Sequence, residues 1–328
     1  MIYHDKPYLQ LLDMIVDEGV EKTDRTGTGT LSIFGEQLSF SLMDGYFPLL
    51  NTKHVSIDNV SNELDWFLSG STNIKWLIDR KCNIWNSDCY RVYQTKHGSK
   101  LTFKEFIDKI KTDEEFSLEH GNMGKIYGYQ WRKWFGEYDQ IKNVYESLKT
   151  EPFSRRHVIT AWNPAELKNM GLPPCHILIQ FNCSPISETR QKVLQTKSNI
   201  QLDLKFVMRS TDTFLGLPYN IASYSILLIK FAYALGYFPG KVVFSGGDIH
   251  LYKNHIEAAK IQLEREPFVS PRFYIDESFI PQDILSKWDE TDVLKKLNSI
   301  PIKIENYVHH PTIKAPLSTG AVIDTNDD

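Results

Sequence analysis

The stretch Asn220-Ile-Ala-Ser-Tyr-Ser-Ile-Leu-Leu-Ile-Lys-Phe-Ala-Tyr-Ala-Leu235 decides the fold class of this chain. Its residues are apolar on most helical faces and the run stops at Gly236, a pattern that predicts a central, buried helix. The run contains Lys230 and is too short to span a bilayer, so we interpret it as a core element of a globular protein.

Segments on both sides of this helix predict the rest of the architecture. Strand composition occurs in four stretches: 157–162, 177–181, 202–208 and, with an irregularity at Gly35, 31–40. Helical spacing of apolar residues occurs earlier, over 8–15 and 57–67. Helices at both ends and strands clustered in the middle indicate an α+β fold and not an alternating βαβ fold.

The chain shows no internal repeat or flexible linker, so we expect a single domain over residues 1–317. Two polar stretches, near 87–123 and 184–200, are interpreted as less regular insertions; the first includes a short helix at 103–110, and the second is a loop between two strands. Residues 318–328 are polar, and we expect this C-terminal extension to be loosely held.

The composition excludes several classes of protein. With 328 residues and 41% hydrophobic content, the chain can bury a large core. Its net charge of −4 provides no excess of positive charge that would favour binding to nucleic acid. The four cysteines, Cys82, Cys89, Cys175 and Cys183, match no common zinc motif, so no metal site is predicted. No signal peptide is recognised, and we expect reduced thiols and a cytoplasmic location, in a host cytoplasm if the source is viral.

The sequence Pro173-Pro-Cys-His176 contains the strongest candidate for a nucleophile. A cysteine is most often a small, buried, apolar residue. Here two prolines fix the approach of the chain to Cys175, and His176 follows it directly. Thiolate is the reactive form, and a neighbouring guanidinium such as that of Arg209 would lower the pKa of the thiol.

Four arginines are candidates for binding a phosphate monoester: Arg25, Arg155, Arg156 and Arg209. An isolated arginine is usually a solvated surface charge, but converging guanidinium groups match phosphate oxygens bidentately. Arg25 lies in the loop Asp24-Arg-Thr-Gly-Thr-Gly29, which is not a P-loop because the closing Gly-Lys-Ser/Thr is missing.

A further set of polar residues suits a polar heterocycle: Ser210, Asp212, Asn220, His250 and Tyr252. The amide of Asn220 carries a donor and an acceptor, as an imide edge such as that of uracil requires. His250 and Tyr252 share one face if their segment is extended. Each of these residues has a simpler alternative, as a helix cap or as a hydrogen-bonded polar residue of the core.

Eight ordered blocks of the sequence resemble those of the thymidylate synthase family. They are Asp24-Arg-Thr-Gly-Thr-Gly29, Phe47-Pro-Leu-Leu-Asn-Thr-Lys53, Glu63-Leu-Asp-Trp-Phe-Leu68, Tyr127-Gly-Tyr-Gln-Trp-Arg132, Ser154-Arg-Arg156, Pro174-Cys-His176, Arg209-Ser-Thr-Asp-Thr-Phe-Leu-Gly-Leu-Pro-Tyr-Asn220 and Gly247-Asp-Ile-His-Leu-Tyr252. The resemblance extends from about Tyr8 to Pro316, interrupted by the two polar insertions.

The resemblance implies a fold and an activity. The fold would be that of thymidylate synthase, a mixed central sheet packed by helices, in a homodimer formed through the sheets. Cys175 would attack C6 of dUMP, so that C5 takes the one-carbon unit from the cosubstrate 5,10-methylenetetrahydrofolate. Reduction of that unit would give dTMP and dihydrofolate. Membrane partners are not expected, and nucleic acid is not an expected partner.

The resemblance also implies roles for individual residues. At dUMP these are Arg25, Arg209 and Ser210 for the phosphate, with Arg155 and Arg156 donated across the dimer interface, Asn220 for the uracil edge, and His250 and Tyr252 for the ribose hydroxyl. In catalysis beside Cys175 they are Glu63, Tyr127 and His176 for proton transfer, together with Arg209 and Asp212. At the folate they are Trp85 and Asp212 for the pterin, Gly216, and Lys53 for the glutamate tail. Asn220 favours dUMP, since a carboxylic acid would be expected there in a cytosine-specific relative.

The chain departs from the family pattern on the folate side. Asn86-Ser87-Asp88 follows Trp85, where the family usually has Asp, any residue, then Trp or Asn, and Met208 stands where Gln is common. Twelve residues follow Pro316, so closure by a terminal carboxylate cannot take its usual form. Entry of water would give 5-hydroxymethyl-dUMP and tetrahydrofolate, so a dUMP hydroxymethylase is the alternative activity. A non-catalytic nucleotide- or RNA-binding relative is a weaker alternative.

Overall fold

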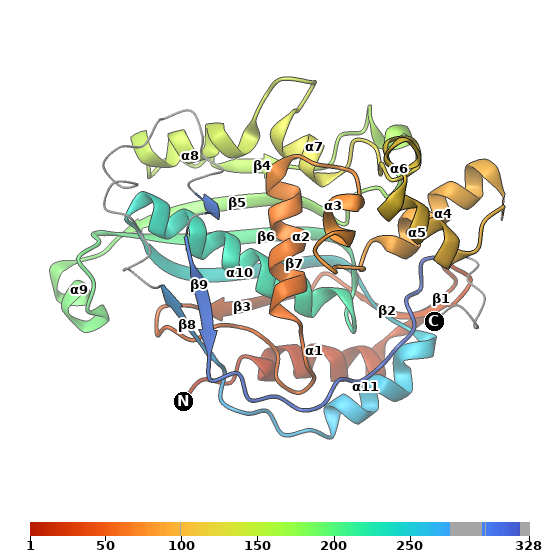
Figure 1. Cartoon of the computed structure of the whole chain (residues 1–328). Helices are drawn as coiled ribbons and strands as arrows, with labels where there is room; N and C mark the ends of the chain where they lie inside the picture. Colours follow the sequence, from red (N-terminus) through yellow and green to blue (C-terminus); the bar gives the residue numbers. More distant parts are fainter. Residues whose placement is uncertain (99, 276–296, 299, 322–328) are drawn as a thin grey trace.

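The structure is a computed structural model that describes residues 1–98, 100–275, 297–298 and 300–321 (Figure 1). Its strands are β1 (Val20–Lys22), β2 (Thr30–Phe34), β3 (Gln37–Ser41), β4 (Val158–Thr160), β5 (His176–Pro185), β6 (Ile200–Asp212), β7 (Phe238–Tyr252), β8 (Arg272–Ile275) and β9 (Ile302–Glu305). Its helices are α1 (Asp5–Glu18), α2 (Ile57–Ser69), α3 (Lys75–Ile78), α4 (Asn86–His97), α5 (Phe103–Thr112), α6 (Glu114–His120), α7 (Tyr127–Arg132), α8 (Gln140–Thr150), α9 (Glu188–Leu194), α10 (Gly216–Leu235) and α11 (Ile256–Leu263).

Seven strands form one mixed sheet. Their order is β1-β2-β7-β6-β5-β4, and β3 also pairs with β7. β6 and β7 are parallel, with Phe206 opposite Phe244, whereas the other pairs in this sheet are antiparallel. Two neighbouring parallel strands need a long crossover, and α10 provides it. β8 and β9 pair in a separate two-stranded sheet.

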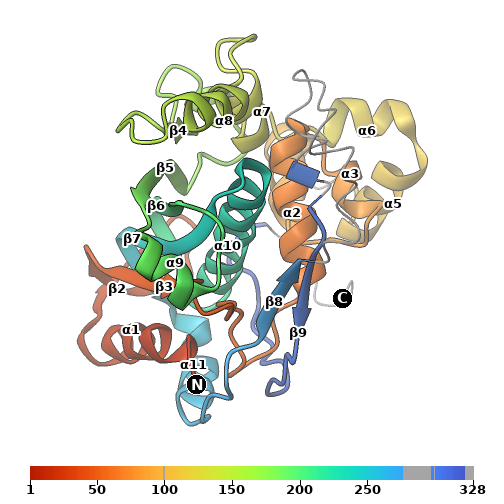
Figure 2. The same ribbon diagram turned by 90° about the vertical axis from the view of Figure 1, so that its left-hand side faces the viewer.

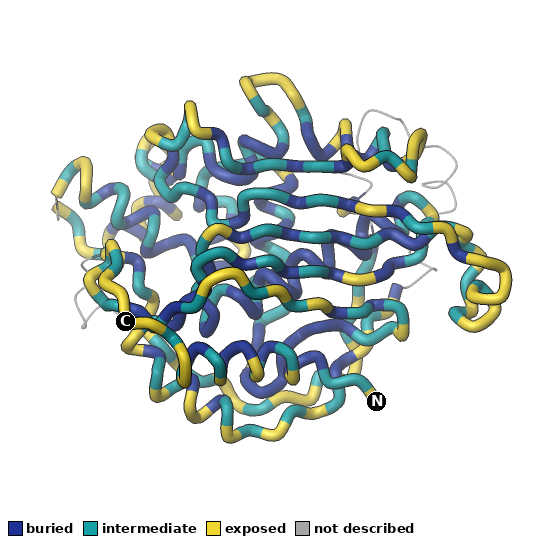
Figure 3. Tube along the Cα trace, turned by 180° about the vertical axis from the view of Figure 1, so that it is seen from behind, coloured by how far each residue is buried: buried dark blue, intermediate teal, exposed yellow. Residues whose placement is uncertain are grey.

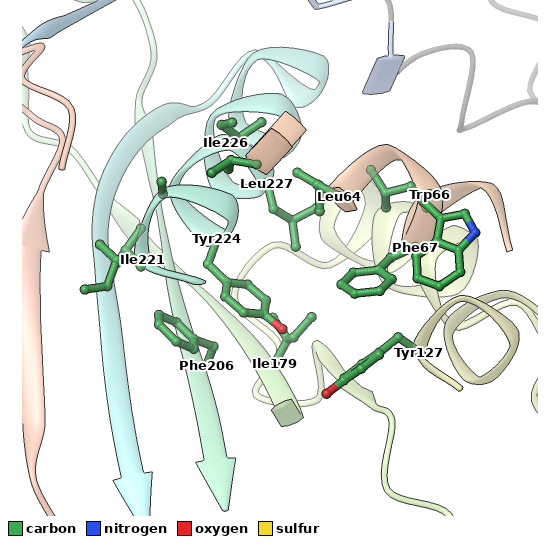
Figure 4. Close-up of a cluster of buried hydrophobic side chains, with 14 of the residues drawn as sticks. Leu64, Trp66, Phe67, Tyr127, Ile179, Phe206, Ile221, Tyr224, Ile226 and Leu227 are labelled. Carbon is green, nitrogen blue, oxygen red and sulfur yellow. The ribbon is translucent and has the colours of Figure 1, made fainter. Parts of the chain in front are cut away.

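The helix α10 lies at the centre of the core, between the main sheet on one side and α2 on the other (Figure 2). Tyr224 of this helix stacks on Phe206 of β6 with ring centroids 4.3 Å apart, within a larger apolar cluster (Figure 4). The buried Lys230 donates from Nζ to Oδ1 of Asp65 on α2 at 2.7 Å, which pairs its charge inside the core.

The opposite face of the sheet lies open to view from behind (Figure 3). Along β6 the buried residues Leu204 and Phe206 alternate with the half-buried residues Lys205 and Val207. This alternation is typical of a sheet that packs a core with one face and leaves the other uncovered within the chain.

The prediction of an α+β fold is confirmed by this mixed sheet and its helical cover. The buried helix begins at Gly216 rather than at Asn220. The stretch 31–40 comprises two strands, β2 and β3, which both pair with β7. They meet at Gly35, whose φ of +95° is a conformation that favours glycine.

The short helix predicted at 103–110 is confirmed by α5, but the prediction of irregular structure in the rest of the two polar insertions was wrong. The first insertion contains α4, α5 and α6, because aromatic side chains give these polar helices a common buried face. The rings of Tyr90 and Tyr93 lie 5.4 and 5.0 Å from that of Phe106. The second insertion contains α9, whose N-terminus is capped by Ser187, which accepts a hydrogen bond from the Arg190 amide.

The C-terminal extension was also expected to be loosely held, and this is wrong for Ser318 and Thr319. Thr319 is only 9% exposed, and its carbonyl accepts a hydrogen bond from Arg25 Nη1 at 3.1 Å. The end of the extension, 322–328, lies outside the described residues. In the part of the chain that the structure describes, no helix is long and apolar enough to cross a membrane.

Candidate active site

The antiparallel pairing of β5 and β6 brings Cys175 next to Arg209. His176, the first residue of β5, lies opposite Met208, and the Arg209 amide donates to the Cys175 carbonyl at 2.9 Å. The guanidinium of Arg209 is held here as well, because Nε donates to the Pro174 carbonyl at 2.9 Å and Nη2 to that of Pro173 at 3.0 Å. The two prolines therefore supply acceptors that fix the cation beside the thiol.

The parallel pairing of β6 and β7 adds the other polar residues to the same end of the sheet. Ser210 lies opposite Asp248, and Asp212 lies opposite His250. The chain then turns into α10, and the Asp212 carboxylate accepts hydrogen bonds from the amides of Phe214 and Leu215, both at 3.0 Å. This contact fixes the start of the helix that carries Asn220.

Two cavities meet at Cys175, and we call them the inner and outer cavity. The inner cavity, of about 250 Å³, is lined by Arg25, Glu63, Phe67, Ile84, Trp85, Asp88, Tyr127, Leu172, Cys175, His176, Met208, Ser210, Asp212, Gly216, Asn220, Tyr252 and Leu317–Thr319. The outer cavity, of about 500 Å³, is lined by Lys22–Thr26, Thr30, Leu172, Pro173, Cys175, Arg209, Ser210, Asp212, Asp248, His250 and Tyr252. The thiol thus stands between an outer space that holds Arg25 and Arg209 and an inner one that holds Glu63, Trp85 and Asn220.

The outer cavity can bind an anion. Arg25 and Arg209 contribute two guanidinium groups and Ser210 a hydroxyl to its lining. The loop that carries Arg25 is held by Asp24, whose carboxylate accepts from the Thr26 and Gly29 amides, both at 2.8 Å. This positions two of the four arginines that the sequence suggested for a phosphate.

The other two arginines, Arg155 and Arg156, are not brought to Cys175 within one chain. They are exposed in the segment before β4 and line a separate surface cavity. Val158 pairs with Gln180 in the middle of β5, and the antiparallel register carries Arg155 and Arg156 toward the far end of that strand. At about 3.3 Å per residue, this register places Arg156 roughly 20 Å from Cys175.

The thiol of Cys175 is subject to two opposing effects. Burial raises its pKa, while the guanidinium of Arg209 lowers it. The backbone amide of Cys175 donates to Tyr127 Oη at 2.7 Å, which holds that phenol beside the sulfur. None of the four cysteines forms a disulfide bond. Cys82, Cys89 and Cys183 are buried, whereas Cys175 is half-buried.

His176 orients Asn220 and is not itself a cation. Burial lowers the pKa of His176 to about 3, so the ring is neutral. Asn220 Nδ2 donates to its Nε2 at 2.9 Å, so the proton must be on Nδ1, which donates to Tyr224 Oη at 2.9 Å. Asn220 Oδ1 and the second amide hydrogen are then left to bind a ligand in the inner cavity.

Glu63 is suited to proton transfer near neutral pH. Burial raises its pKa to about 7, while the hydrogen bond from Trp85 opposes this shift. Trp85 Nε1 donates to Glu63 Oε1 at 2.7 Å, so the indole and the carboxyl line the inner cavity as one unit.

Lys53 is enclosed behind the cavity wall and is not among the residues that line either cavity. Its Nζ donates to the Phe214 carbonyl and lies over the Phe214 ring. Burial lowers the pKa of Lys53 to about 7, and Asp212 acts in the opposite direction. Of the residues predicted for the folate, the structure therefore brings Trp85, Asp212 and Gly216 into the inner cavity but not Lys53.

The ribose candidates lie at the outer cavity. The ring of His250 is held by Asp248, with Nδ1 and Oδ1 3.0 Å apart, and packs against Tyr252 with ring centroids 5.1 Å apart. Sequence reasoning missed Asp248, and it missed Tyr224 behind His176. The only signal was position: Asp248 is two residues before His250 along an extended strand, and Tyr224 is one helical turn after Asn220.

One comparison with known proteins identifies the family. Residues 6–319 match the family model described as thymidylate synthase. The match covers nearly the whole chain, so the chain belongs to the thymidylate synthase family. Proteins of this family transfer a one-carbon unit to dUMP and use methylenetetrahydrofolate as the cosubstrate.

We predict that Arg209→Gln slows alkylation of Cys175 by iodoacetamide near neutral pH. Loss of the cation raises the pKa of the thiol, so the thiolate fraction and the alkylation rate should fall several-fold. Mass spectrometry of the modified peptide measures the rate. At alkaline pH, where the Cys175 thiol is ionised in both proteins, the two alkylation rates should converge. A deficit that persists there would mean that the substitution moved the sulfur and not its pKa.

Proposed function

We propose that the chain transfers a one-carbon unit from 5,10-methylenetetrahydrofolate to C5 of dUMP and that the unit is reduced, giving dTMP and dihydrofolate. The observation that supports this most directly is the place of Cys175 between the arginine-lined outer cavity and the inner cavity, which offers an amide and carboxyl groups. A nucleotide that puts its phosphate on Arg25 and Arg209 would present its base to the thiol.

Cys175 is the nucleophile in this proposal. Its thiolate adds to C6 of the uracil, and the electrons of the C5–C6 double bond pass to C5 and O4. The unreactive C5 thereby becomes a carbon nucleophile. Arg209 favours the thiolate against the effect of burial. The same cation contributes to binding the phosphate, so substrate binding and activation of the sulfur are coupled.

The protein groups around the base supply recognition and proton transfer. Asn220, oriented by His176, meets the imide edge with one donor and one acceptor, while His250 and Tyr252 bind the ribose hydroxyl. Glu63 stabilises charge at O4 and, through water held with Tyr127, accepts the proton that leaves C5. Its pKa of about 7 suits a group that must both take up and release a proton.

The inner cavity has the lining that a pterin requires. Trp85 offers an aromatic surface, Asp212 an acceptor for ring N–H groups, and Gly216 a close approach to the backbone. When bound, the folate supplies the one-carbon unit and the hydride that reduces it, and it leaves as dihydrofolate. Leu317, Ser318 and Thr319 close one side of this space and would exclude water during the reduction.

A dUMP hydroxymethylase is the second candidate, and one observation favours it. Asp88 places a carboxyl group in the lining of the inner cavity, where the family usually has Trp or Asn. A carboxylate can hold and activate water beside the C5 methylene. The product would then be 5-hydroxymethyl-dUMP, and tetrahydrofolate would be left unoxidised.

The active unit in this proposal is a homodimer. Arg155 and Arg156 lie too far from Cys175 to bind the same phosphate within one chain. The uncovered face of the sheet offers the surface for pairing (Figure 3). A two-fold axis through paired sheets would exchange these arginines between subunits, completing two shared sites.

We predict that the wild-type protein releases tritium from [5-³H]dUMP and forms dTMP and dihydrofolate in equal amounts as its main products. Cys175→Ala should abolish all of these signals, because no adduct at C6 can form. Chromatography of the nucleotides and the absorbance of dihydrofolate provide the measurement. Formation of hydroxymethyl-dUMP without dihydrofolate would contradict the synthase and support the dUMP hydroxymethylase.

A mixing experiment tests the shared site. Cys175→Ala and the double variant Arg155→Ala/Arg156→Ala should each be inactive alone. After equal amounts are unfolded and refolded together, half of the dimers are mixed and each has one intact site, so about a quarter of wild-type activity should return. If the arginines act within their own chain, the mixture stays inactive.

Removal of residues 318–328 should reduce kcat by about tenfold or more, with a smaller change in the dUMP dissociation constant, because Ser318 and Thr319 help to wall off the inner cavity from water. A chain that ends at Ala321 keeps every described tail contact and is the matched control. Unchanged kcat in the shorter chain would mean that the extension takes no part in closing the site.

A further inference from the structure

Asp88 is a half-buried titratable residue that the proposed synthase mechanism does not use. It lies in the first turn of α4, one helical turn after Trp85, and its side chain is 15% exposed. It lines the inner cavity together with Trp85, Leu172 and Cys175. The carboxyl group is close enough to Cys175 to raise the pKa of the thiol, against the larger effect of Arg209.

The partners of Asp88 leave part of its carboxylate available. Oδ1 lies 3.6 Å from Arg91 Nη2, and that same nitrogen donates to the Gly171 carbonyl at 2.8 Å. Oδ2 has no hydrogen-bond partner among the described residues. It is also not one of the solvent-inaccessible polar atoms that lack a partner. It is therefore accessible from the cavity, where a water molecule can donate to it.

The charges around Asp88 keep it usable as a base. Burial raises the pKa of the carboxyl, while Arg91 and Arg25 oppose this shift. The two cations favour the ionised carboxylate, which is the form that can take a proton from water. Arg25 is itself held in place by the Thr319 carbonyl, so the first residues of the extension fix this charge environment.

The position of Asp88 matters at one point of the reaction. After transfer of the one-carbon unit, an exocyclic methylene on C5 lies beside Trp85 in the proposed complex, and it can accept either hydride or water. The carboxyl of Glu63 is occupied by the Trp85 indole on one side of this ring. Asp88 stands one turn along on the same helix, with an oxygen free for water.

We propose that Asp88 sets the fate of the C5 methylene by delivering water to it, so that a fraction of turnover ends as 5-hydroxymethyl-dUMP. The oxygen of water bonds to the methylene carbon while Asp88 takes its proton. The electrons pass through C5 and O4 and expel the Cys175 thiolate from C6, which restores the C5–C6 double bond. The step needs no oxidant or reductant, and it leaves tetrahydrofolate intact.

This inference rests on the one-carbon transfer proposed above, and its test separates the two. With [5-³H]dUMP and methylenetetrahydrofolate, the wild type should release more tritium than it forms dihydrofolate, and the difference should equal the hydroxymethyl-dUMP found. In Asp88→Asn the ratio of hydroxymethyl-dUMP to dTMP should fall by about tenfold or more, since a general base contributes about 10²–10⁴ to such a step. Tritium release should continue, because the early steps do not use Asp88.

Three variants distinguish a base from a structural residue. Asp88→Glu, which restores a carboxylate, should retain more hydroxymethyl product than Asp88→Asn. Arg91→Gln breaks the ion pair and the bond to Gly171 but keeps the carboxylate, so it should also retain the hydroxymethyl product. Asp79→Asn removes an exposed carboxylate directly after helix α3, paired with Lys75 at 3.2 Å, and should match the wild type.

Four outcomes would contradict the proposed role of Asp88. Equal tritium and dihydrofolate in the wild type, or an unchanged product ratio in Asp88→Asn, would overturn the role of Asp88 alone. The same holds if Arg91→Gln reproduces the effect of Asp88→Asn, which would mark a structural role. An absence of tritium release in the wild type would overturn the one-carbon transfer itself, and the inference with it.

Discussion

The parallel pairing of β6 and β7 is the constraint on which the site depends. It sets Ser210 against Asp248 and Asp212 against His250, residues that are nearly forty positions apart in the sequence. A parallel pair must be joined by a crossover, and the crossover α10 begins where β6 ends. Asn220 on its first turns therefore lies at the same edge. The buried helix that defines the fold is also the element that closes the site.

Burial governs the chemistry of the groups gathered at that edge. It raises the pKa of the Cys175 thiol and that of the Glu63 carboxyl, and it lowers the pKa of His176. For the thiol this effect is unfavourable, and the guanidinium of Arg209 opposes it. For the carboxyl it is useful, since a pKa of about 7 allows proton exchange near neutrality. The same buried environment thus requires a cation beside the Cys175 sulfur, whereas the Glu63 carboxyl functions without one.

The sequence alone was sufficient to predict the helices and strands that are apolar and regular. It was not sufficient to predict those that are stabilised by tertiary contacts. The helix over 220–235 and the strands around it have strong patterns, whereas α4, α5 and α6 depend on ring contacts between Tyr90, Tyr93 and Phe106 that no local pattern reports. Likewise, motifs predicted Cys175, Arg209 and Asn220 as site residues. The enclosure of Lys53 and the packing of Thr319 over the cavity depend on contacts between distant segments.

The topology of the sheet also explains why Arg155 and Arg156 lie far from Cys175 within one chain. β4 and β5 are antiparallel neighbours, so the segment before β4 and the segment before β5 must lie at opposite ends of the sheet. Arg155 and Arg156 belong to the first segment and Cys175 to the second, and no rearrangement of side chains spans that distance. A two-fold axis perpendicular to paired sheets brings opposite ends together. In the homodimer proposed above, the uncovered face would therefore serve catalysis as well as assembly, because each phosphate site would draw cations from both subunits.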